Sequence, residues 1–430
     1  MNIKLIKTED LFGILLILLP IALISGPFFS DLIVTLFCIY ALINLKISKI
    51  NFNTNFFKLG LLFYLCFFLN SLLFEYRDQG FQSSFFYFRF LFFAIGMKIL
   101  LDKNEVYLKY FFYACIFSIL IVSSFGLYEY LSYTFEYVKK YHEYKSENHL
   151  LGLKFIYSEF PNRISGIFKD ELIMGSFIYK MYPLFLILFF YFNKNLNYKN
   201  SFIFIIFTLL CIFITIISGD RAPLILLTFF IFLMFVVCSP SRKIFLQIIL
   251  ISSIFGVLLI IFDARIKERL IDQTYRNITG SYNNSKTTLI TKEHQGHFKG
   301  SFVIFKKYPI LGAGSKGFRN QCFNNFKSEK GVICTTHPHS PYLQLLSETG
   351  IVGFSIVLIF FIYLFLKIFF YENLKKNNRP IYINAIYITF FVYFWPLTTS
   401  GSIFNNYNSI IYYIPLGIMF FLKQKEKCLN

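Results

Sequence analysis

Two histidines stand close together before an apolar run, in the stretch CTTHPHSPYLQLLSETG at residues 334–350. His337 and His339 are separated by one proline, which argues against a continuous helix through both. Imidazole titrates near neutral pH, and this favours a role as general base. Two other interpretations stay open: hydrogen-bonded histidines at a membrane interface, and metal ligands. For a metal, the sequence offers only His294, His297 and scattered acids nearby, so we expect no metal site.

A second candidate group is an arginine between two apolar runs. The segment FITIISGDRAPLILL, residues 212–226, places Asp220 and Arg221 there with almost no loop. Arginine at membrane depth is costly in free energy and persists where it pairs or meets a ligand. One interpretation is an Asp220–Arg221 pair in a tight turn, with Pro223 at the start of the next helix. The other is that Arg221 presents its guanidinium to an anion such as a diphosphate.

A polar segment before another apolar run carries two more cations. Residues 161–177, PNRISGIFKDELIMGSF, contain Arg163 and Lys169. One interpretation is a solvated helix N-terminus with acidic residues in its first turn. The alternative is that both cations extend the anion site.

A third basic segment begins the longest polar stretch of the chain. In DARIKERLIDQTYRN, residues 263–277, Arg265, Arg269 and Arg276 recur at spacings of four and seven. In a helix these arginines share one face. That face either lies on anionic lipid headgroups or supplies a further cation to the anion site.

Two of the eight cysteines lie together in a polar loop. Cys322 and Cys334 are twelve residues apart and can form a disulfide in an oxidising compartment. The alternative is a pair of free thiols, because a sequence gives no Cα distance. Five other cysteines lie in or at the ends of apolar runs and are typical core residues: Cys38, Cys66, Cys115, Cys211 and Cys238.

The composition is that of a membrane protein. The chain is 56% hydrophobic and 15% charged, whereas soluble domains carry about 25% charged residues. About twelve apolar runs predict an all-α polytopic membrane protein. They fall at residues 11–28, 31–45, 57–74, 84–101, 106–131, 172–192, 201–218, 222–238, 245–262, 341–370, 381–396 and 407–422.

The positive charge assigns sides to these runs. A net charge of +19 would suggest nucleic-acid binding in a soluble protein. Here most Lys and Arg flank apolar runs, as the positive-inside rule describes, so we expect no nucleic-acid partner. If the runs alternate, the basic short loops and both termini fall on one side, which predicts cytoplasmic termini. The basic loops are residues 46–58, 98–109, 193–200, 239–244 and 367–380.

Two long polar segments then lie on the outer side of the membrane. Loops of this length are usually functional or disordered. The expected organisation has five parts: transmembrane helices 1–5 at 1–131, a first outer loop at 132–171, helices 6–9 at 172–262, a large and partly helical outer loop at 263–340, and helices 10–12 with a cytoplasmic tail at 341–430.

Three blocks in this order resemble the O-antigen ligase and Wzy-type polymerase superfamily of bacterial envelope glycosyltransferases. They are SGDRAPLILL, PILGAGSKGF and HPHSPYLQLLSETGIVGF; RISGIFKDELIMGS and FWPLTTSGSIFNNYNS are also similar to family segments. The resemblance covers most of residues 150–420. One departure is Ser340, which stands where the family commonly has Asn.

The resemblance implies a C-type glycosyltransferase-like fold and an inverting, metal-independent, cofactor-free transfer at the periplasmic face of the bacterial inner membrane. The donor would be a glycan on undecaprenyl diphosphate. The acceptor would be a lipid A-core hydroxyl in a ligase, or another lipid-linked glycan in a polymerase, with membrane lipids around both.

Site roles follow from joining this chemistry to the residues above. A cation stabilises the charge that develops on the leaving diphosphate, and Arg221 is the first choice, supported by Arg163 or Arg265. The attacking hydroxyl needs a base, for which His339 is the first choice and His337 the second. A flippase for lipid-linked oligosaccharides is a rival reading, although the sequence has no sign of the inverted repeats typical of transporters.

Overall fold

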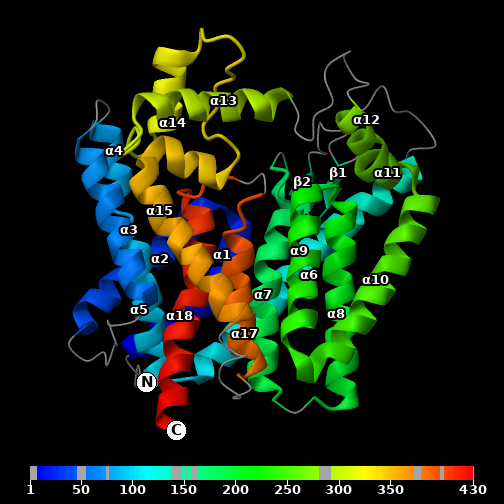
Figure 1. The fold of residues 1–430 in the computed structure, drawn as a ribbon. Helices are drawn as coiled ribbons and strands as arrows, with labels where there is room; N and C mark the ends of the chain where they lie inside the picture. The colour runs from blue at the N-terminus through cyan, green and yellow to red at the C-terminus, as the bar shows by residue number, and fades with distance from the viewer. Residues whose placement is uncertain are drawn as a thin grey trace.

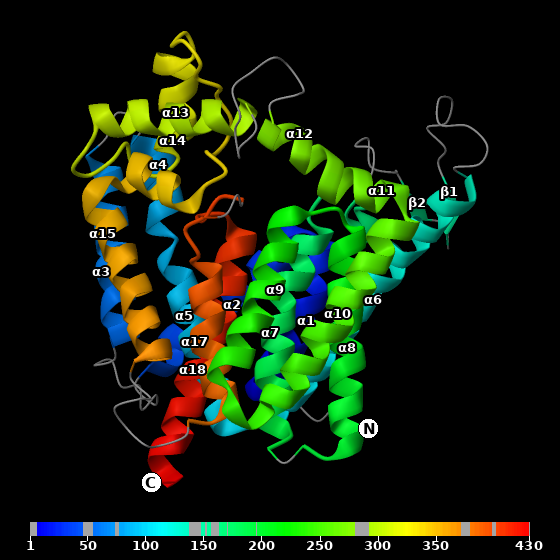
Figure 2. The same ribbon diagram turned by 45° about the vertical axis from the view of Figure 1, so that its right-hand side comes forward.

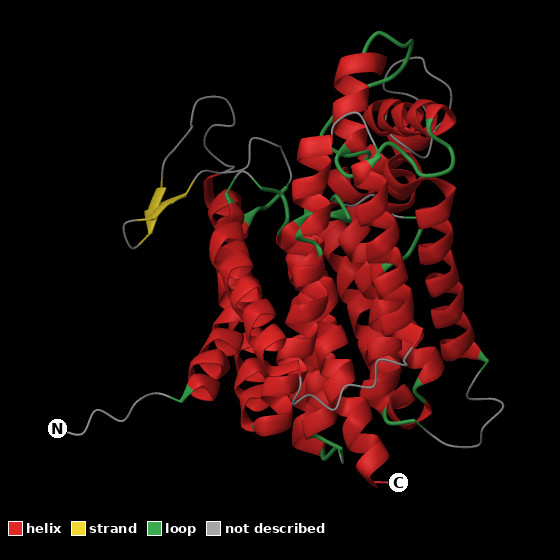
Figure 3. Ribbon diagram, turned by 90° about the vertical axis from the view of Figure 1, so that its left-hand side faces the viewer, coloured by secondary structure: helices red, strands yellow, loops and turns green. Residues whose placement is uncertain are grey.

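The computed structural model is helical and describes most of the chain. It covers residues 7–45, 55–73, 77–136, 148–150, 153–155, 163–169, 171–194, 196–279, 292–370, 379–397 and 401–429. One small hairpin, β1 (Asn148–Leu150) with β2 (Leu153–Phe155), stands apart from the helices (Figure 3). Much of the expected first outer loop, including residues 137–147 and 156–162, lies outside the described residues.

The helices form one bundle with a helical cap (Figure 1). The bundle contains α1 (Thr8–Ser25), α2 (Pro27–Asn44), α3 (Asn55–Leu72), α4 (Arg77–Phe85), α5 (Phe88–Lys103), α6 (Val106–Glu136), α7 (Met174–Phe192), α8 (Tyr198–Ile217), α9 (Arg221–Val237), α10 (Arg242–Phe262), α15 (Pro341–Phe369), α17 (Ile381–Tyr393) and α18 (Asn406–Leu429). The cap contains α11 (Ala264–Lys267), α12 (Gln273–Thr279), α13 (Lys292–Lys307) and α14 (Gly317–Gln321). It covers the end of the bundle opposite to the C-terminus, which we call the loop face.

The expectation of a helical membrane protein is confirmed. Eight helices among the described residues are long and apolar enough to cross a membrane, and three shorter apolar helices accompany them. In lipid every backbone N–H and C=O must be satisfied inside the segment, so apolar runs of this length fold as helices. Each expected run overlaps a helix of the bundle, whereas twelve spans, and a large loop between the ninth and tenth, stay predictions.

Burial separates the centre of the bundle from its lipid-facing rim. In α7 nearly every residue from Met174 to Phe190 is buried. In α10 only Phe245 and Ile248 are buried. A helix that is apolar on all sides and buried on all sides is a central helix, and α7 therefore forms the middle of the bundle while α10 faces lipid.

The cap is docked on the bundle through a break in α15. Gly350 has a φ of 61° and interrupts the helix, and Gly312 has a φ of 75° in the turn that packs there. A Cβ on Gly312 would lie 2.4 Å from the Glu348 carbonyl carbon, so the close approach requires glycine. Two backbone hydrogen bonds join the turn to the helix. The Ala313 N–H donates to the Ser347 carbonyl oxygen at 2.8 Å, and the Ile351 N–H donates to the Pro309 carbonyl oxygen at 2.9 Å.

Helix α3 holds the same junction from its other side. The Asn70 amide donates to the Glu348 carbonyl oxygen at 2.7 Å, and the Ser315 N–H donates to the Ser71 hydroxyl at 3.3 Å. Glu348 also accepts from the Phe318 N–H of α14 at 3.3 Å. The first helices of the chain thus help to fix the cap, a role that their hydropathy does not reveal.

Candidate functional site

Three arginines gather around one buried carboxylate on the loop face. Asp220, at the N-terminal cap of α9, is only 7% exposed and forms an ion pair with Arg163. Arg269 donates to the Gly219 carbonyl oxygen at 3.0 Å. Arg269 and Arg221 share one acceptor, the Gln273 side-chain oxygen, at 2.6 and 3.3 Å. Arg163, Arg221 and Arg269 with Asp220 are called the arginine cluster below.

The arginine cluster carries more positive than negative charge. Burial, together with the charges of Arg163 and Arg221, lowers the pKa of Arg269 to about 10. Burial raises the pKa of Asp220, while the charge of Arg163 opposes that rise. Three guanidiniums against one carboxylate leave a surplus suited to an anion with two charges. Within the described part of the structure, Nε of Arg163 and Nε of Arg221 have no hydrogen-bond partner.

The arginine cluster is assembled by two backbone features. Glu129 of α6 accepts from the N–H groups of Ser165 and Gly166, at 3.1 and 2.6 Å, and this holds the turn that presents Arg163. Gly175 at the start of α7 allows the Ser218–Asp220 turn to pack closely, because a Cβ there would lie 2.5 Å from the Ser218 hydroxyl. Segments from three parts of the chain therefore meet at one point.

Arg265 lies in a different set of contacts from the one expected. It pairs with Asp263 at 2.8 Å, and its guanidinium carbon lies 4.7 Å from the centre of the Tyr130 ring. Burial alone would raise the pKa of Asp263, but the hydrogen bonds from Arg265 and Tyr130 lower it to about 2. Arg269, one helical turn later, occupies the place in the arginine cluster that was expected for Arg265. Its spacing of four from Arg265 was the only sequence signal for it.

Four histidines gather where α13 meets the loop before α15. The His339 ring centre lies 4.2 Å from that of His337, 5.3 Å from that of His297 and 5.5 Å from that of His294. These residues are called the histidine cluster below. His337 contacts the Thr336 hydroxyl through Nδ1 at 2.9 Å. The structure thus brings both sequence candidates together with two histidines that lie 40 residues and more before them.

His339 has unusual backbone and side-chain environments. Its φ of 55° is uncommon for a residue other than glycine, and such residues concentrate at functional sites. Burial lowers the pKa of His339 to about 4, and the charges of His337, His294 and His297 act in the same direction. At neutral pH this imidazole is therefore neutral and able to accept a proton.

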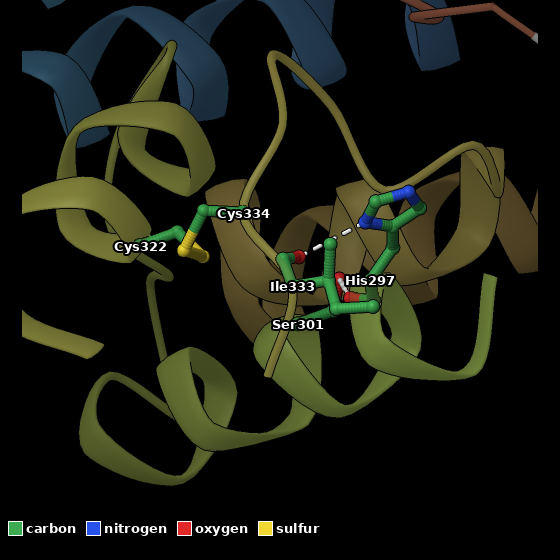
Figure 4. The surroundings of a disulfide bond; sticks show 5 residues. All are labelled: His297, Ser301, Cys322, Ile333 and Cys334. Carbon is green, nitrogen blue, oxygen red and sulfur yellow. Dashed lines mark hydrogen bonds between the residues drawn. A yellow bond between two sulfur atoms is a disulfide. The ribbon is translucent and has the colours of Figure 1, made fainter. Parts of the chain in front are cut away.

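A disulfide fixes the loop that carries His337 and His339. Cys322 and Cys334 are bonded, with Cα atoms 5.5 Å apart (Figure 4). On the residue before Cys334, Ile333, the carbonyl oxygen lies 2.9 Å from His297 Nδ1, as Figure 4 shows. The disulfide ties the loop to the segment that follows α14, and the Ile333 contact ties it to α13.

Lys180 is a buried residue that the hydropathy pattern did not indicate. It lies in α7, is 3% exposed, and its ammonium donates to the Asn408 side-chain oxygen of α18 at 2.6 Å. The rings of Tyr179 and Tyr407 lie 5.6 Å from the ammonium on either side. Lys180 is five residues beyond Gly175, about 7.5 Å along the helix from the arginine cluster. A single lysine in an apolar run gives no signal of its depth.

No metal-ligand set is formed by the residues that the structure describes. Three or more His, Cys, Asp or Glu side chains are nowhere arranged there to share an ion.

The comparisons with known proteins agree with the motifs. Residues 206–358 match a family model described as O-antigen ligase. The match runs from α8 into α15 and includes Arg221, Arg269 and the histidine cluster. No curated protein matches the chain. Over residues 206–358 this match supports the resemblance of the sequence blocks to the O-antigen ligase and Wzy-type polymerase superfamily.

Proposed function

We propose that this protein is an O-antigen ligase-like glycosyltransferase of the bacterial inner membrane. It transfers a saccharide from undecaprenyl diphosphate to a hydroxyl of lipid A-core on the periplasmic face, with both termini in the cytoplasm. The observation that supports the proposal is that the arginine cluster at the start of α9 and the histidine cluster between α13 and α15 lie on the same face of one membrane bundle (Figure 2).

The arginine cluster binds the donor diphosphate. Arg221 and Arg269 are oriented by Gln273, and Arg163 is oriented by Asp220. Preorganised donors of this kind stabilise charge as it develops on a leaving group in a site shielded from water. The surplus of positive charge takes the role that a divalent ion plays in many transferases, so the reaction needs no metal or cofactor.

His339 removes the proton from the acceptor hydroxyl. The hydroxyl oxygen then bonds to the anomeric carbon of the donor sugar, the bond from that carbon to the diphosphate oxygen breaks, and the configuration inverts. A base works best when its pKa is near the working pH. In the protein without ligand the pKa of His339 is lowered to about 4 by burial and by the neighbouring histidines, so the proposed role requires that bound substrate raise it. His337, held by Thr336, orients the loop.

The test is the envelope polysaccharide of a deletion strain on a gel that resolves chain length. Long glycans that remain on undecaprenyl diphosphate, with bare lipid A-core, are the expected result. A single repeat on the core with no ladder above it would make the protein a polymerase. Movement of labelled lipid-linked sugar across the membrane without any change in glycan length would make it a transporter.

Purified components test the metal independence separately. Transfer in the presence of EDTA should proceed at the rate measured without it. Activity that returns only after Mg²⁺ is added would contradict the role given to the arginines.

A further inference from the structure

A large apolar pocket lies in the half of the bundle away from the arginine cluster. It contains about 800 Å³ of space not filled by protein, part of it open at the surface, and is lined by side chains of α3, α5, α15, α17 and α18 with the chain just before α18. Its lining is almost wholly aliphatic and aromatic. One of its few polar groups, the Tyr87 hydroxyl, accepts from Ser409 at 3.1 Å. A site of this apolar character suits an apolar ligand.

The pocket opens towards lipid on the side of α3. Leu59 and Phe63 of α3 are half-buried, whereas Phe390 of α17 and Leu416 of α18 are buried in its inner wall. The neighbouring Leu62 of α3 is 52% exposed and so faces outward. At membrane depth the surrounding medium is hydrocarbon, so the ligand that enters from this side is a lipid chain.

Helix α15 links the pocket wall to the loop that carries His339. This helix begins at Pro341, two residues after His339, and Ile356 in the pocket wall lies fifteen residues further. The helix breaks at Gly350, and Ile356 lies about 9 Å beyond that break along the second part of the helix. Because α15 begins at the loop face, a lipid whose chain lies beside Ile356 has its headgroup directed towards that face, where the histidine cluster lies.

The arginine cluster is positioned by other helices. It lies at the starts of α7 and α9, and neither helix contributes to the pocket wall. Figure 2 shows α3 and α15 on one side of the bundle and α8, α9 and α10 on the other. A donor held by its diphosphate at the arginine cluster extends its own chain elsewhere, so the chain in the pocket belongs to a second lipid.

We propose that this pocket binds an acyl chain of the glycolipid that carries the acceptor hydroxyl. The proposal rests on the proposed function and assigns its two lipid substrates to two halves of the bundle. The acyl chain lies between α3 and α15, and the sugar head of the same molecule reaches His339.

Gly60 offers a direct way to fill the pocket. It lies in the pocket wall on α3, and a Cβ added there meets no atom within 4 Å. Replacing a helical glycine also favours the helix, so Gly60→Trp occupies the pocket without straining the fold. The matched control is Gly256→Trp on lipid-facing α10, where the nearest atom to an added Cβ is Ile216 Cδ1 at 3.9 Å.

The kinetic test compares two acceptors with the purified full-length protein. Gly60→Trp should raise KM for lipid A-core at least about tenfold, since displacing about two buried methylene groups has that effect. It should leave KM for the donor, and the rate with deacylated core oligosaccharide, unchanged. Gly256→Trp should behave as wild type, and Gly60→Leu should fall between wild type and Gly60→Trp.

A binding test needs no turnover and separates failure of this proposal from failure of the proposed function. A lipid A probe with a diazirine on an acyl chain should label peptides of α3 and α15 in wild type and in Gly256→Trp, but not in Gly60→Trp. Labelling of the same peptides by a diazirine-bearing polyprenyl diphosphate would overturn the assignment to the acceptor. So would equal labelling of all three proteins, or an unchanged KM for lipid A-core in Gly60→Trp.

Discussion

The arginine cluster and the histidine cluster solve opposite electrostatic problems. In the arginine cluster three cations are brought together and kept charged, with Asp220 offsetting only part of the charge. In the histidine cluster four imidazoles are brought together, and burial with mutual repulsion keeps His339 neutral. Guanidinium stays charged at any physiological pH, whereas imidazole changes charge with its surroundings. Under the proposed function, the arginine cluster holds an anion and the histidine cluster accepts a proton.

The largest effect is expected for the proton acceptor. His339→Ala should lower kcat by about 10²–10⁴, the usual contribution of a general base. Binding of the donor should be unchanged, because the arginine cluster is intact. Steady-state transfer and a donor-binding titration measure the two quantities. Full activity of this variant would move the base elsewhere.

The second-largest effect is expected when an arginine is removed from the arginine cluster. Arg269→Ala should lower transfer by about 10²–10³, as loss of one preorganised donor does, and should weaken donor binding as well. Arg276→Ala is the control, because Arg276 pairs with Glu268 in a partly exposed site. Pairs of that kind contribute about 0–1 kcal/mol. Equal losses in both variants would show that the cluster holds no ligand.

The pH dependence of transfer should report on the histidine cluster alone, without a substitution in either cluster. In the protein without ligand, kcat/KM should fall as the pH drops through about 4, where His339 takes up a proton. In the unfolded chain the pKa of this histidine is about 6.5. The contribution of His339 to the free energy of unfolding therefore increases as the pH rises from about 4 to about 6.5, and it is lost as the pH falls. His294→Gln removes one repelling neighbour and should shift the profile to higher pH. An unshifted profile would contradict the coupling of the rings.

Loss of the disulfide should have the smallest effect on chemistry and a clear effect on stability. A bond that closes a loop of this length contributes about 3 kcal/mol, so Cys322→Ser should lower the midpoint of thermal unfolding and reduce kcat through a looser His339 loop. Donor binding should be retained. Cys66→Ala, at a free cysteine of α3, is the control that should leave both values near wild type.

The sequence predicts local features well and long-range contacts poorly. The apolar runs form helices because a helix satisfies the backbone hydrogen bonds within its own segment, as a lipid environment requires. From their spacing, Arg265 and Arg269 are equally good candidates for the arginine cluster. The structure distinguishes them because Arg265 pairs with Asp263 instead. The approach of His294 and His297 to His339, and of Asn70 to Glu348, depends on how distant segments dock. Nothing in the local pattern of α7 and α10 says which of them is central.

Binding and turnover measured on the same two variants test the division between the clusters most directly. Purified Arg269→Ala and His339→Ala would each be titrated with undecaprenyl diphosphate and then assayed for transfer to lipid A-core. The predicted result is that Arg269→Ala loses both binding and transfer, while His339→Ala binds as wild type and loses only transfer. Wild-type binding by Arg269→Ala, or loss of binding in His339→Ala, would contradict it.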